Sequence, residues 1–227
     1  MTTRIDRDAA EAGTPVHSAH PRRRFRFLRG WRLALSLALV LVLATTWVRA
    51  VWWDIYYINS SSMEPTLVPG ERILVKRDAG APHRGDVVVF DGRGSYAPYE
   101  RRTAADDLLR TLHLRGGDSV YVKRVLGVGG DTVECCDAKG RLLVNGEPLD
   151  EPYLQPGDVA SELRFSVEVP AHRLWLMGDH RSVSQDSRSL LGAPGGGMVA
   201  EDRVIGTVTR IVWPITDNRP VTATGEQ

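Results

Sequence analysis

The amino-acid sequence predicts a mainly β protein, with antiparallel strands in a barrel-like or sandwich core, preceded by one membrane-spanning helix. Beyond residue 53, short runs rich in β-branched residues alternate with turn signals, as in antiparallel β domains. In that part only residues 103–112 follow a helical pattern, and this segment is short. The one long apolar run lies near the N-terminus. We therefore expect a basic tail at 1–30, a transmembrane signal-anchor helix at 31–53, a β domain at 54–218 and a C-terminal tail at 219–227.

Charge is divided unevenly along the chain. Residues 1–32 hold eight arginines against three acidic residues, which gives this segment a net charge of +5. The remaining 21 basic and 25 acidic residues give the rest of the chain a net charge of −4. A mildly acidic body argues against nucleic acid as its partner, and a basic N-terminal segment suits a chain that crosses a membrane. Residues 1–21 are polar and rich in small residues, so we expect them to be disordered.

The apolar run has the length of a membrane anchor. Residues 33–48 carry no charge, and residues 50–53 extend the run to about 20 residues if the Arg49 side chain reaches the headgroups. Arginines precede the run and tryptophans bracket it, so the positive-inside rule places the N-terminus in the cytoplasm and the body outside. A cleaved signal peptide with its site at residues 48–50 is the alternative. Its apolar core would be long and Arg49 would lie inside the site, which favours a single-pass anchor.

Eight segments of the body have strand patterns. They are residues 72–76, 86–90, 119–128, 132–134, 142–145, 163–169, 174–177 and 204–213. Gly and Pro dipeptides separate several of them as turns. Asn145-Gly146 is the best hairpin signal, because this pair favours the tight turn that joins two antiparallel strands. Residues 92–117 show no pattern that assigns them a role.

The two cysteines, Cys135 and Cys136, are adjacent. Outside the reducing cytosol they can form a vicinal disulfide, and two partly buried thiols in a turn are the alternative. Neither histidine nor a further cysteine lies nearby, whereas zinc takes about four ligands, so this pair makes a poor zinc site. We expect no metal and no cofactor.

Three consecutive serines in NSSSMEPTL, residues 59–67, raise the question of a nucleophile. A nucleophilic serine needs a base, and His180 is the one histidine candidate for a triad. Lys123 is the other candidate base, on a strand pattern that places Tyr121, Lys123 and Val125 on one face. On a core strand a lysine loses hydration and its pKa falls, whereas arginine would stay protonated. A solvent-facing Lys123 is the alternative.

Four motifs follow the anchor in a fixed order. They are SSSMEPTL at 60–67, RGDVVVF at 84–90, YVKRVLGVGGDTV at 121–133 and GDHRSVSQDSR at 178–188. This series resembles the successive motifs of type I signal peptidases, the membrane-anchored serine proteases that remove secretory signal peptides. Four ordered motifs are much more specific than a lone Ser-x-Met. The resemblance implies the antiparallel, barrel-like catalytic domain of that family and a Ser-Lys dyad.

The resemblance also implies a role for each matching residue. Ser62, immediately before the methionine, corresponds to the nucleophile, and Lys123 corresponds to the general base. The Ser60 hydroxyl and the Ser62 N–H correspond to the oxyanion hole, while Ser184 corresponds to the serine that orients the lysine amine.

In the fourth motif, Asp186 and Arg188 correspond to an ion pair, and Gly178 and Asp179 to a tight turn beside the lysine. The family's usual GDNRDNS reads GDHRSVS here, so three loop positions differ: His180, Ser182 and Val183. We expect these differences to leave the proton transfer intact.

The substrates that the resemblance implies are the signal peptides of exported preproteins. Their extended segment would add a strand beside Tyr121 and Val122, with Met63 at the turn that presents the nucleophile. The lipid bilayer is the second expected partner, nucleic acid is not expected, and we expect a monomer. The protein would lie in the cell membrane with its catalytic domain outside the cytoplasm.

Two other classes of protein compete with this interpretation. Self-cleaving repressor domains use a similar Ser-Lys dyad, yet they carry a DNA-binding module where this chain has its apolar run. A non-catalytic, membrane-tethered β domain that binds a partner would use the serine run as a linker, but it leaves the four ordered motifs unexplained.

Overall fold

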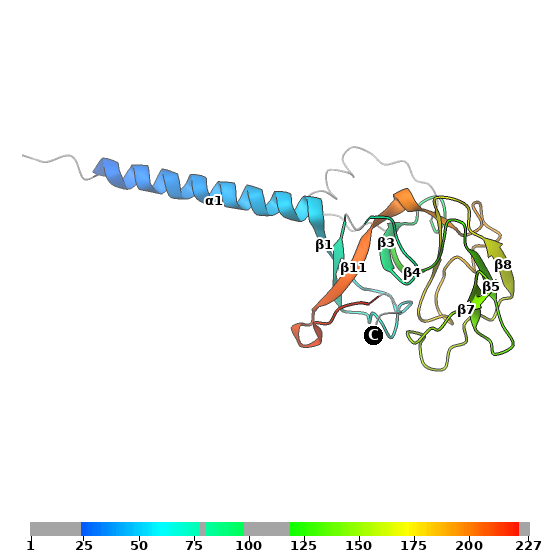
Figure 1. Cartoon of the computed structure of the whole chain (residues 1–227). Helices are drawn as coiled ribbons and strands as arrows, with labels where there is room; N and C mark the ends of the chain where they lie inside the picture. Colours follow the sequence, from blue (N-terminus) through cyan, green and yellow to red (C-terminus); the bar gives the residue numbers. More distant parts are fainter. Residues whose placement is uncertain (1–23, 78–79, 98–118, 223–227) are drawn as a thin grey trace, which may run out of the picture. The chain divides into compact units, whose positions relative to one another are not determined.

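The computed structural model describes residues 24–77, 80–97 and 119–222 (Figure 1). The chain divides into two compact units, Met1–Thr46 and Trp47–Gln227. The helix that the sequence predicts at 103–112 and the expected disordered tail at 1–21 lie outside the described residues.

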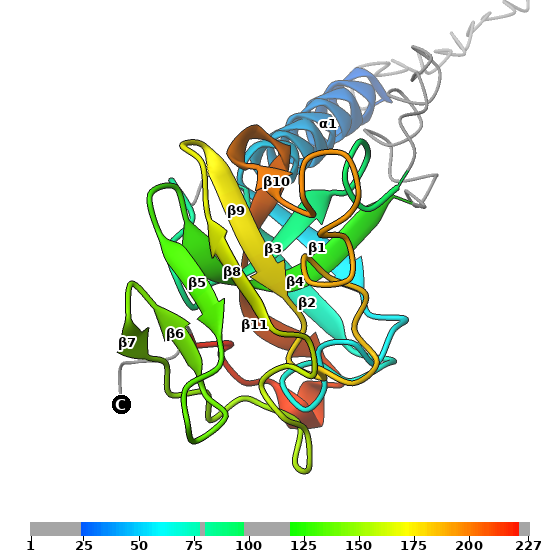
Figure 2. The ribbon, with the colours of Figure 1, turned by 90° about the vertical axis from the view of Figure 1, so that its right-hand side faces the viewer.

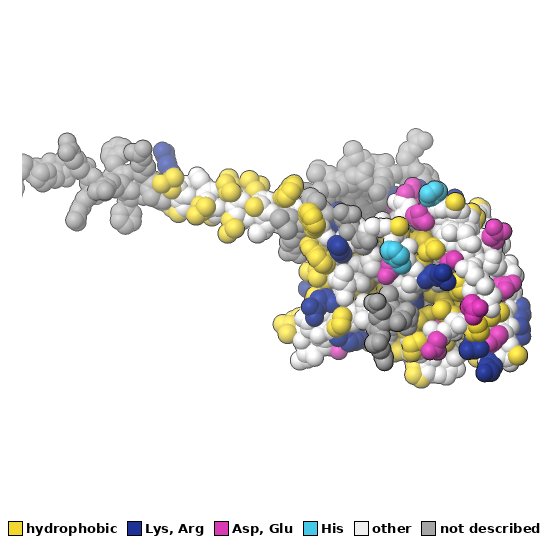
Figure 3. All heavy atoms as spheres, in the orientation of Figure 1, with side chains coloured by type: hydrophobic (Ala, Val, Ile, Leu, Met, Phe, Trp, Pro, Cys, Tyr) yellow, Lys and Arg dark blue, Asp and Glu magenta, His cyan; other side chains and the backbone are white. Residues whose placement is uncertain are grey.

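Helix α1, Arg24–Trp52, occupies most of the predicted anchor at 31–53. Its apolar side chains are exposed along the helix, among them Leu33, Leu37 and Leu41 (Figure 3). Among the helices that the structure describes, none combines the length and apolarity needed to cross a membrane. The helix ends one residue before the predicted anchor does, because Trp53 begins a β-strand.

A seven-stranded sheet forms the larger part of the second unit (Figure 2). Its strand order is β1-β2-β11-β3-β4-β9-β10, and all neighbours run antiparallel. The strands are β1 (Trp53–Tyr57), β2 (Arg72–Lys76), β3 (Val87–Asp91), β4 (Val120–Val128), β9 (Arg173–Met177), β10 (Val199–Ala200) and β11 (Val204–Trp213). A single turn of 3-10 helix, Glu201–Arg203, joins the last two, and another, Ile215–Asp217, follows β11.

A four-stranded antiparallel sheet follows β4 in the chain, with the order β7-β6-β5-β8. Its strands are β5 (Thr132–Cys135), β6 (Leu142–Val144), β7 (Glu147–Pro148) and β8 (Phe165–Glu168). Asn145 and Gly146 join β6 to β7 with positive φ angles of 54° and 81°, as the tight hairpin turn requires. The Asn-Gly hairpin prediction is therefore confirmed.

Apolar side chains pack on both faces of the larger sheet. Strand β3 is buried throughout: Val87 and Val89 belong to one core cluster, and Val88 and Phe90 belong to another. This two-sided burial explains why its sequence is a continuous apolar run rather than an alternating one. A third cluster, around Trp175, joins the two sheets.

The predicted strands agree with the structure to within a few residues at their ends, and the mainly antiparallel β class is confirmed. Three strands were not predicted: β1, β7 and β10. Strand β1 directly continues the apolar run in sequence. Strands β7 and β10 have two residues each, which is too short to show an alternating pattern. The two cysteines form a vicinal disulfide, at the end of β5, which settles the alternative left open by the sequence.

Candidate active site

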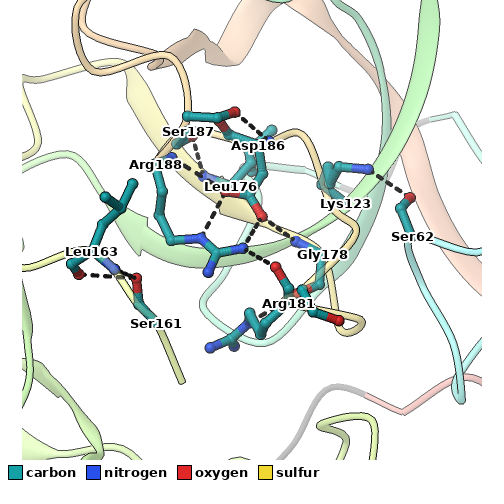
Figure 4. Close-up of polar contacts among 12 residues, drawn as sticks. Ser62, Lys123, Ser161, Leu163, Leu176, Gly178, Arg181, Asp186, Ser187 and Arg188 are labelled. Carbon is teal, nitrogen blue, oxygen red and sulfur yellow. Dashed lines mark hydrogen bonds and ion pairs between the residues drawn. The ribbon is translucent and has the colours of Figure 1, made fainter. Parts of the chain in front are cut away.

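Ser62 and Lys123 meet although their positions in the chain are 61 apart. The Nζ atom of Lys123 lies 2.8 Å from the Oγ atom of Ser62, within hydrogen-bond distance (Figure 4). Ser62 stands in the turn between β1 and β2, and Lys123 stands in β4, opposite Val88 of β3. A turn and a rigid central strand thus bring a hydroxyl and an amine together.

Lys123 is buried, with 4% of its surface exposed. Desolvation by burial lowers the pKa of its amine to about 8, against the opposing effect of the negative charges of Asp186 and Asp179. The amine also donates a hydrogen bond to the carbonyl oxygen of Val122, at 3.2 Å. The solvent-facing alternative for Lys123 is wrong, because the side chain lies inside the protein. An amine with this pKa is partly neutral near physiological pH and can accept a proton from Ser62.

Apolar side chains that follow Ser62 in the chain fix its turn to the core. Met63 and Leu67 are buried in the core cluster that also contains Ile58. The N–H of Glu64 donates to the carbonyl of Ser61, and the N–H of Leu67 donates to the carbonyl of Met63. Met63, expected at the substrate site, has only 2% of its surface exposed. In this structure its side chain therefore supports the turn.

The two groups expected to form the oxyanion hole are neighbours. The N–H of Ser62 donates to the Oγ of Ser60 over 3.3 Å, which is a long hydrogen bond. Ser60 is exposed, so its hydroxyl is free to rotate toward another acceptor. Both groups lie beside the nucleophile, and the Oγ of Ser61 is not needed for either contact.

Gly178 brings the fourth motif against Ser62. A β-carbon added at this glycine would lie 2.4 Å from the carbonyl oxygen of Ser62 and 2.3 Å from the Oγ of Ser184. No side chain fits there without a shift of the surroundings. The Gly178 N–H donates to the carboxylate of Asp186 at 3.1 Å, and Arg188 binds the same carboxylate through two hydrogen bonds of 2.9 and 2.8 Å (Figure 4).

Asp179, the next residue, binds a side chain of β4 that points away from the face of Lys123. It is fully buried and accepts two hydrogen bonds from the guanidinium of Arg124, at 2.8 and 2.7 Å. Thr66, in the nucleophile's turn, donates its hydroxyl to the same carboxylate. The ring of Tyr153 stacks on the guanidinium at 4.0 Å. Asp179 thereby links strand β4, which carries Lys123, to the turn that carries Ser62.

Sequence reasoning assigned no role to Arg124, Thr66 or Tyr153. Arg124 carries one usable signal: alternation places it on the same strand face as the apolar residues Val122 and Leu126, and a charge buried among such residues needs a partner. The partner itself lies 55 residues further along the chain, which no local pattern indicates.

Ser184, expected to orient the lysine amine, makes no such hydrogen bond. Its Oγ atom is buried and has no hydrogen-bond partner among the described residues. The residue lines a cavity of about 330 Å³ that also borders Arg181 and Arg188. The structure brings Ser184 beside Gly178, but it does not join its hydroxyl to Lys123.

His180 contacts the turn that carries Ser62 but does not bond the Ser62 hydroxyl. Its backbone N–H donates to the carbonyl of Ser62 at 3.2 Å, and its ring Nδ1 lies 3.2 Å from the carbonyl oxygen of Ser61. The ring is also 3.6 Å from the carboxylate of Glu64. A Ser-His pair is therefore not formed here, because Ser62 Oγ faces Lys123.

Tyr121 and Val122, the expected substrate contacts, are half-buried on β4. The Tyr121 ring packs on Phe90, with ring centroids 5.9 Å apart, and on Tyr96, at 5.5 Å. Tyr96 belongs to the part of segment 92–117 that the structure describes, and its hydroxyl lies 3.3 Å from that of Ser187. This part of the segment thus packs between β4 and the fourth motif.

The close contact at Gly178 leads to a prediction. We expect Gly178→Ala to lower the free energy of unfolding by at least about 2 kcal/mol, because its methyl group would overpack the contact with Ser62. Gly192→Ala is the matched control, since nothing lies within 4 Å of the added carbon, and should change stability by less than about 0.5 kcal/mol. Denaturant titration of both variants measures this. Equal effects at the two positions would contradict the packing argument.

The chain is similar to known proteins over most of its length. The family model described as signal peptidase, peptidase S26, matches residues 29–213. A probable signal peptidase I of Mycobacterium leprae is 34% identical, over 94% of this chain and 85% of that protein. Signal peptidase I T of Bacillus subtilis is 32% identical, over 83% of this chain and 87% of that protein.

Among solved structures, a signal peptidase I of Enterococcus faecalis is 24% identical and superposes with a TM-score of 0.38, covering 57% of this chain and 98% of that one. The family model covers most of this chain, including both residues of the Ser-Lys pair, and the relatives match it over more than four fifths of its length. The chain therefore belongs to the signal peptidase family, peptidase S26.

Proposed function

We propose that this member of the signal peptidase family is a serine endopeptidase that removes signal peptides from exported preproteins through a Ser62–Lys123 dyad. The observation that carries the proposal is the 2.8 Å contact between the Ser62 hydroxyl and a buried lysine amine whose pKa is lowered to about 8. Such an amine can act as a general base near neutral pH, which a solvated lysine cannot.

The proposed reaction proceeds through an acyl-enzyme. Neutral Lys123 accepts the proton of Ser62, whose Oγ attacks the scissile carbonyl carbon of the preprotein. The lysine then gives this proton to the leaving amine, and an ester joins the signal peptide to Ser62. Lys123 next accepts a proton from water, whose oxygen attacks the ester carbonyl carbon. The bond to Ser62 Oγ breaks, Lys123 returns the proton to that oxygen, and the signal peptide leaves with a new carboxyl group.

The developing oxyanion would be bound by the Ser62 N–H and the Ser60 hydroxyl. Binding it requires the 3.3 Å hydrogen bond between these two groups to be exchanged for bonds to substrate. A bond of that length is weak, so the exchange costs little.

The pairing of β4 with its neighbours supports a substrate site along one of its edges. Strand β3 pairs with residues 120–124 of β4, whereas β9 pairs with β4 only from Arg124 onward. Along residues 120–123, the edge of β4 that faces away from β3 is therefore not paired with any of the described strands. An extended signal-peptide segment could add a strand there, beside Tyr121 and Val122 and next to Lys123. Alternate side chains would enter shallow pockets that admit alanine.

We also propose that residues 31–53 hold the protein in the cell membrane as a single-pass anchor, with a cytoplasmic N-terminus and an extracytoplasmic catalytic domain. The uncharged run at 33–48, the preceding arginines and the exposed leucines of α1 support this. The side chains of residues 48–51, which complete the run, lie outside those described. We propose that the protein acts as a monomer.

Removal of either member of the dyad should abolish cleavage. We expect Ser62→Ala and Lys123→Ala to cut a model preprotein in detergent at less than about a thousandth of the wild-type rate. Lys123→Arg should be equally inactive, because guanidinium stays protonated. Ser61→Ala is the matched control and should remain within about twofold of wild type. Cleavage that survives Lys123→Ala would point to another base.

The pH dependence follows from the lowered pKa of Lys123. Only the neutral amine acts as a base, so kcat/KM should rise with pH and level off above an apparent pKa near 8. If the amine were not buried, kcat/KM would keep rising until the pH approached the ordinary lysine pKa of 10.5. Steady-state rates on a peptide substrate measure the profile. Lys139→Ala, which removes an exposed lysine, should leave the midpoint unchanged. A midpoint above pH 10 would be inconsistent with a desolvated base.

The membrane proposal is tested with the full chain. We expect wild-type protein to stay in the membrane pellet after an alkaline wash. Leu37→Arg combined with Leu41→Arg should release it, because each arginine costs about 3 kcal/mol at the centre of a bilayer. Leu37→Ile combined with Leu41→Ile is the control and should behave as wild type. Release of the wild type by the wash would refute the anchor.

A further inference from the structure

His180 stands where the family usually has asparagine, and it touches the nucleophile's turn at two points. Its backbone N–H donates to the carbonyl of Ser62. Its side chain approaches the carbonyl oxygen of Ser61, 3.2 Å from Nδ1. A carbonyl oxygen can only accept, so Nδ1 must carry the proton in this contact. The side-chain contact has no part in the proton transfer between Ser62 and Lys123.

The carbonyl that His180 holds belongs to the same peptide group as the Ser62 N–H. A peptide group is planar, and in the trans form its C=O and N–H point in opposite directions. The Ser61 oxygen also accepts a hydrogen bond from the Glu64 N–H at 3.1 Å, so His180 adds a side-chain donor to a backbone donor. Fixing this oxygen aims the Ser62 N–H to the opposite side, and this N–H is a proposed oxyanion donor. A hydrogen bond to the oxygen also polarises the group and makes its N–H a better donor.

We propose that His180 is a positioning residue for the oxyanion hole, acting through an Nδ1–H hydrogen bond to the Ser61 carbonyl. The inference rests on the proposed function, since an oxyanion forms only if Ser62 is acylated. It also explains how histidine can replace asparagine here. The side-chain amide nitrogen of asparagine is two bonds beyond Cβ, as Nδ1 of histidine is, and it is likewise a donor.

Glu64 offers a competing explanation for this histidine. Its carboxylate lies 3.6 Å from Nδ1, so an ion pair between the two side chains could be what holds the turn. Both side chains are mostly buried, at 18% and 26% exposure. The two explanations differ in what they require: the first needs an N–H donor at residue 180, and the second needs two opposite charges.

The test compares His180→Asn, His180→Asp and His180→Ala in the full-length protein in detergent. Asparagine and aspartate have the same shape, but only asparagine offers N–H. We expect Ala and Asp to lower kcat by about 10- to 100-fold with KM within threefold of wild type, since lost oxyanion stabilisation acts on the transition state. Asn should stay within threefold of wild-type kcat. Glu64→Gln should stay within twofold.

Other results would overturn the proposal. Equal losses for Asn and Asp, or no loss for Ala, would show that the N–H donor is not needed. A loss in Glu64→Gln as large as in His180→Ala would assign the role to the ion pair. Thermal unfolding midpoints of the variants identify any that fail to fold, and the Asn and Asp comparison stands without the Ala variant.

A readout without activity separates this inference from the proposed function. In the ¹⁵N spectrum of histidine-labelled protein at alkaline pH, neutral His180 should carry its proton on Nδ1, as the contact with Ser61 requires. A proton on Nε2 would overturn the inference even if the enzyme cleaves preproteins. If wild type and Ser62→Ala are both inactive on preproteins, the proposed function fails, and this spectrum alone decides whether His180 holds the Ser61 carbonyl.

Discussion

The rest of the site depends on one constraint: the Lys123 amine must be kept from water and yet stay in contact with Ser62. Burial lowers its pKa, but two buried carboxylates, Asp186 and Asp179, oppose this effect. Each carboxylate has an arginine of its own, Arg188 for the first and Arg124 for the second. Because these pairs largely neutralise the negative charge, the amine is not required as a counter-ion. The internal ion pairs thus allow a neutral amine to exist in the core, as the proposed dyad requires.

The position of Ser62 depends on segments far apart in the chain. Gly178 lies against the Ser62 carbonyl, and Thr66 bonds the carboxylate of Asp179. Arg219, which follows β11 in the chain, donates from its guanidinium to the carbonyl of Thr66 at 3.1 Å. The stretch after β11 therefore takes part in holding the turn, and residues 219–222, expected as a tail, are pinned along β11 through Pro220 and Val221. A short turn with few contacts of its own is fixed by its surroundings.

Much of this could be predicted from the sequence, and the reasons for success and failure differ. Strand periodicity and the Asn145-Gly146 signal are local, so most strands and the hairpin could be located. The Ser62 and Lys123 pairing came from motif order, not from any local pattern. What could not be predicted depends on tertiary packing, as at Met63, whose burial follows from the core beneath the turn. The same holds for Ser184, whose hydroxyl lies buried without a partner.

Strand β4 carries two cations in succession, and only one of them can serve as a base. Lys123 faces the nucleophile, while Arg124 faces Asp179 on the other side. Because side chains alternate, a shift of β4 by a single residue would exchange these two environments. A guanidinium that never releases its proton would then stand beside Ser62. The register of β4, held by its pairing with β3 and by the buried bond from Arg124 to Asp179, therefore decides which cation Ser62 meets as well as how the sheet packs.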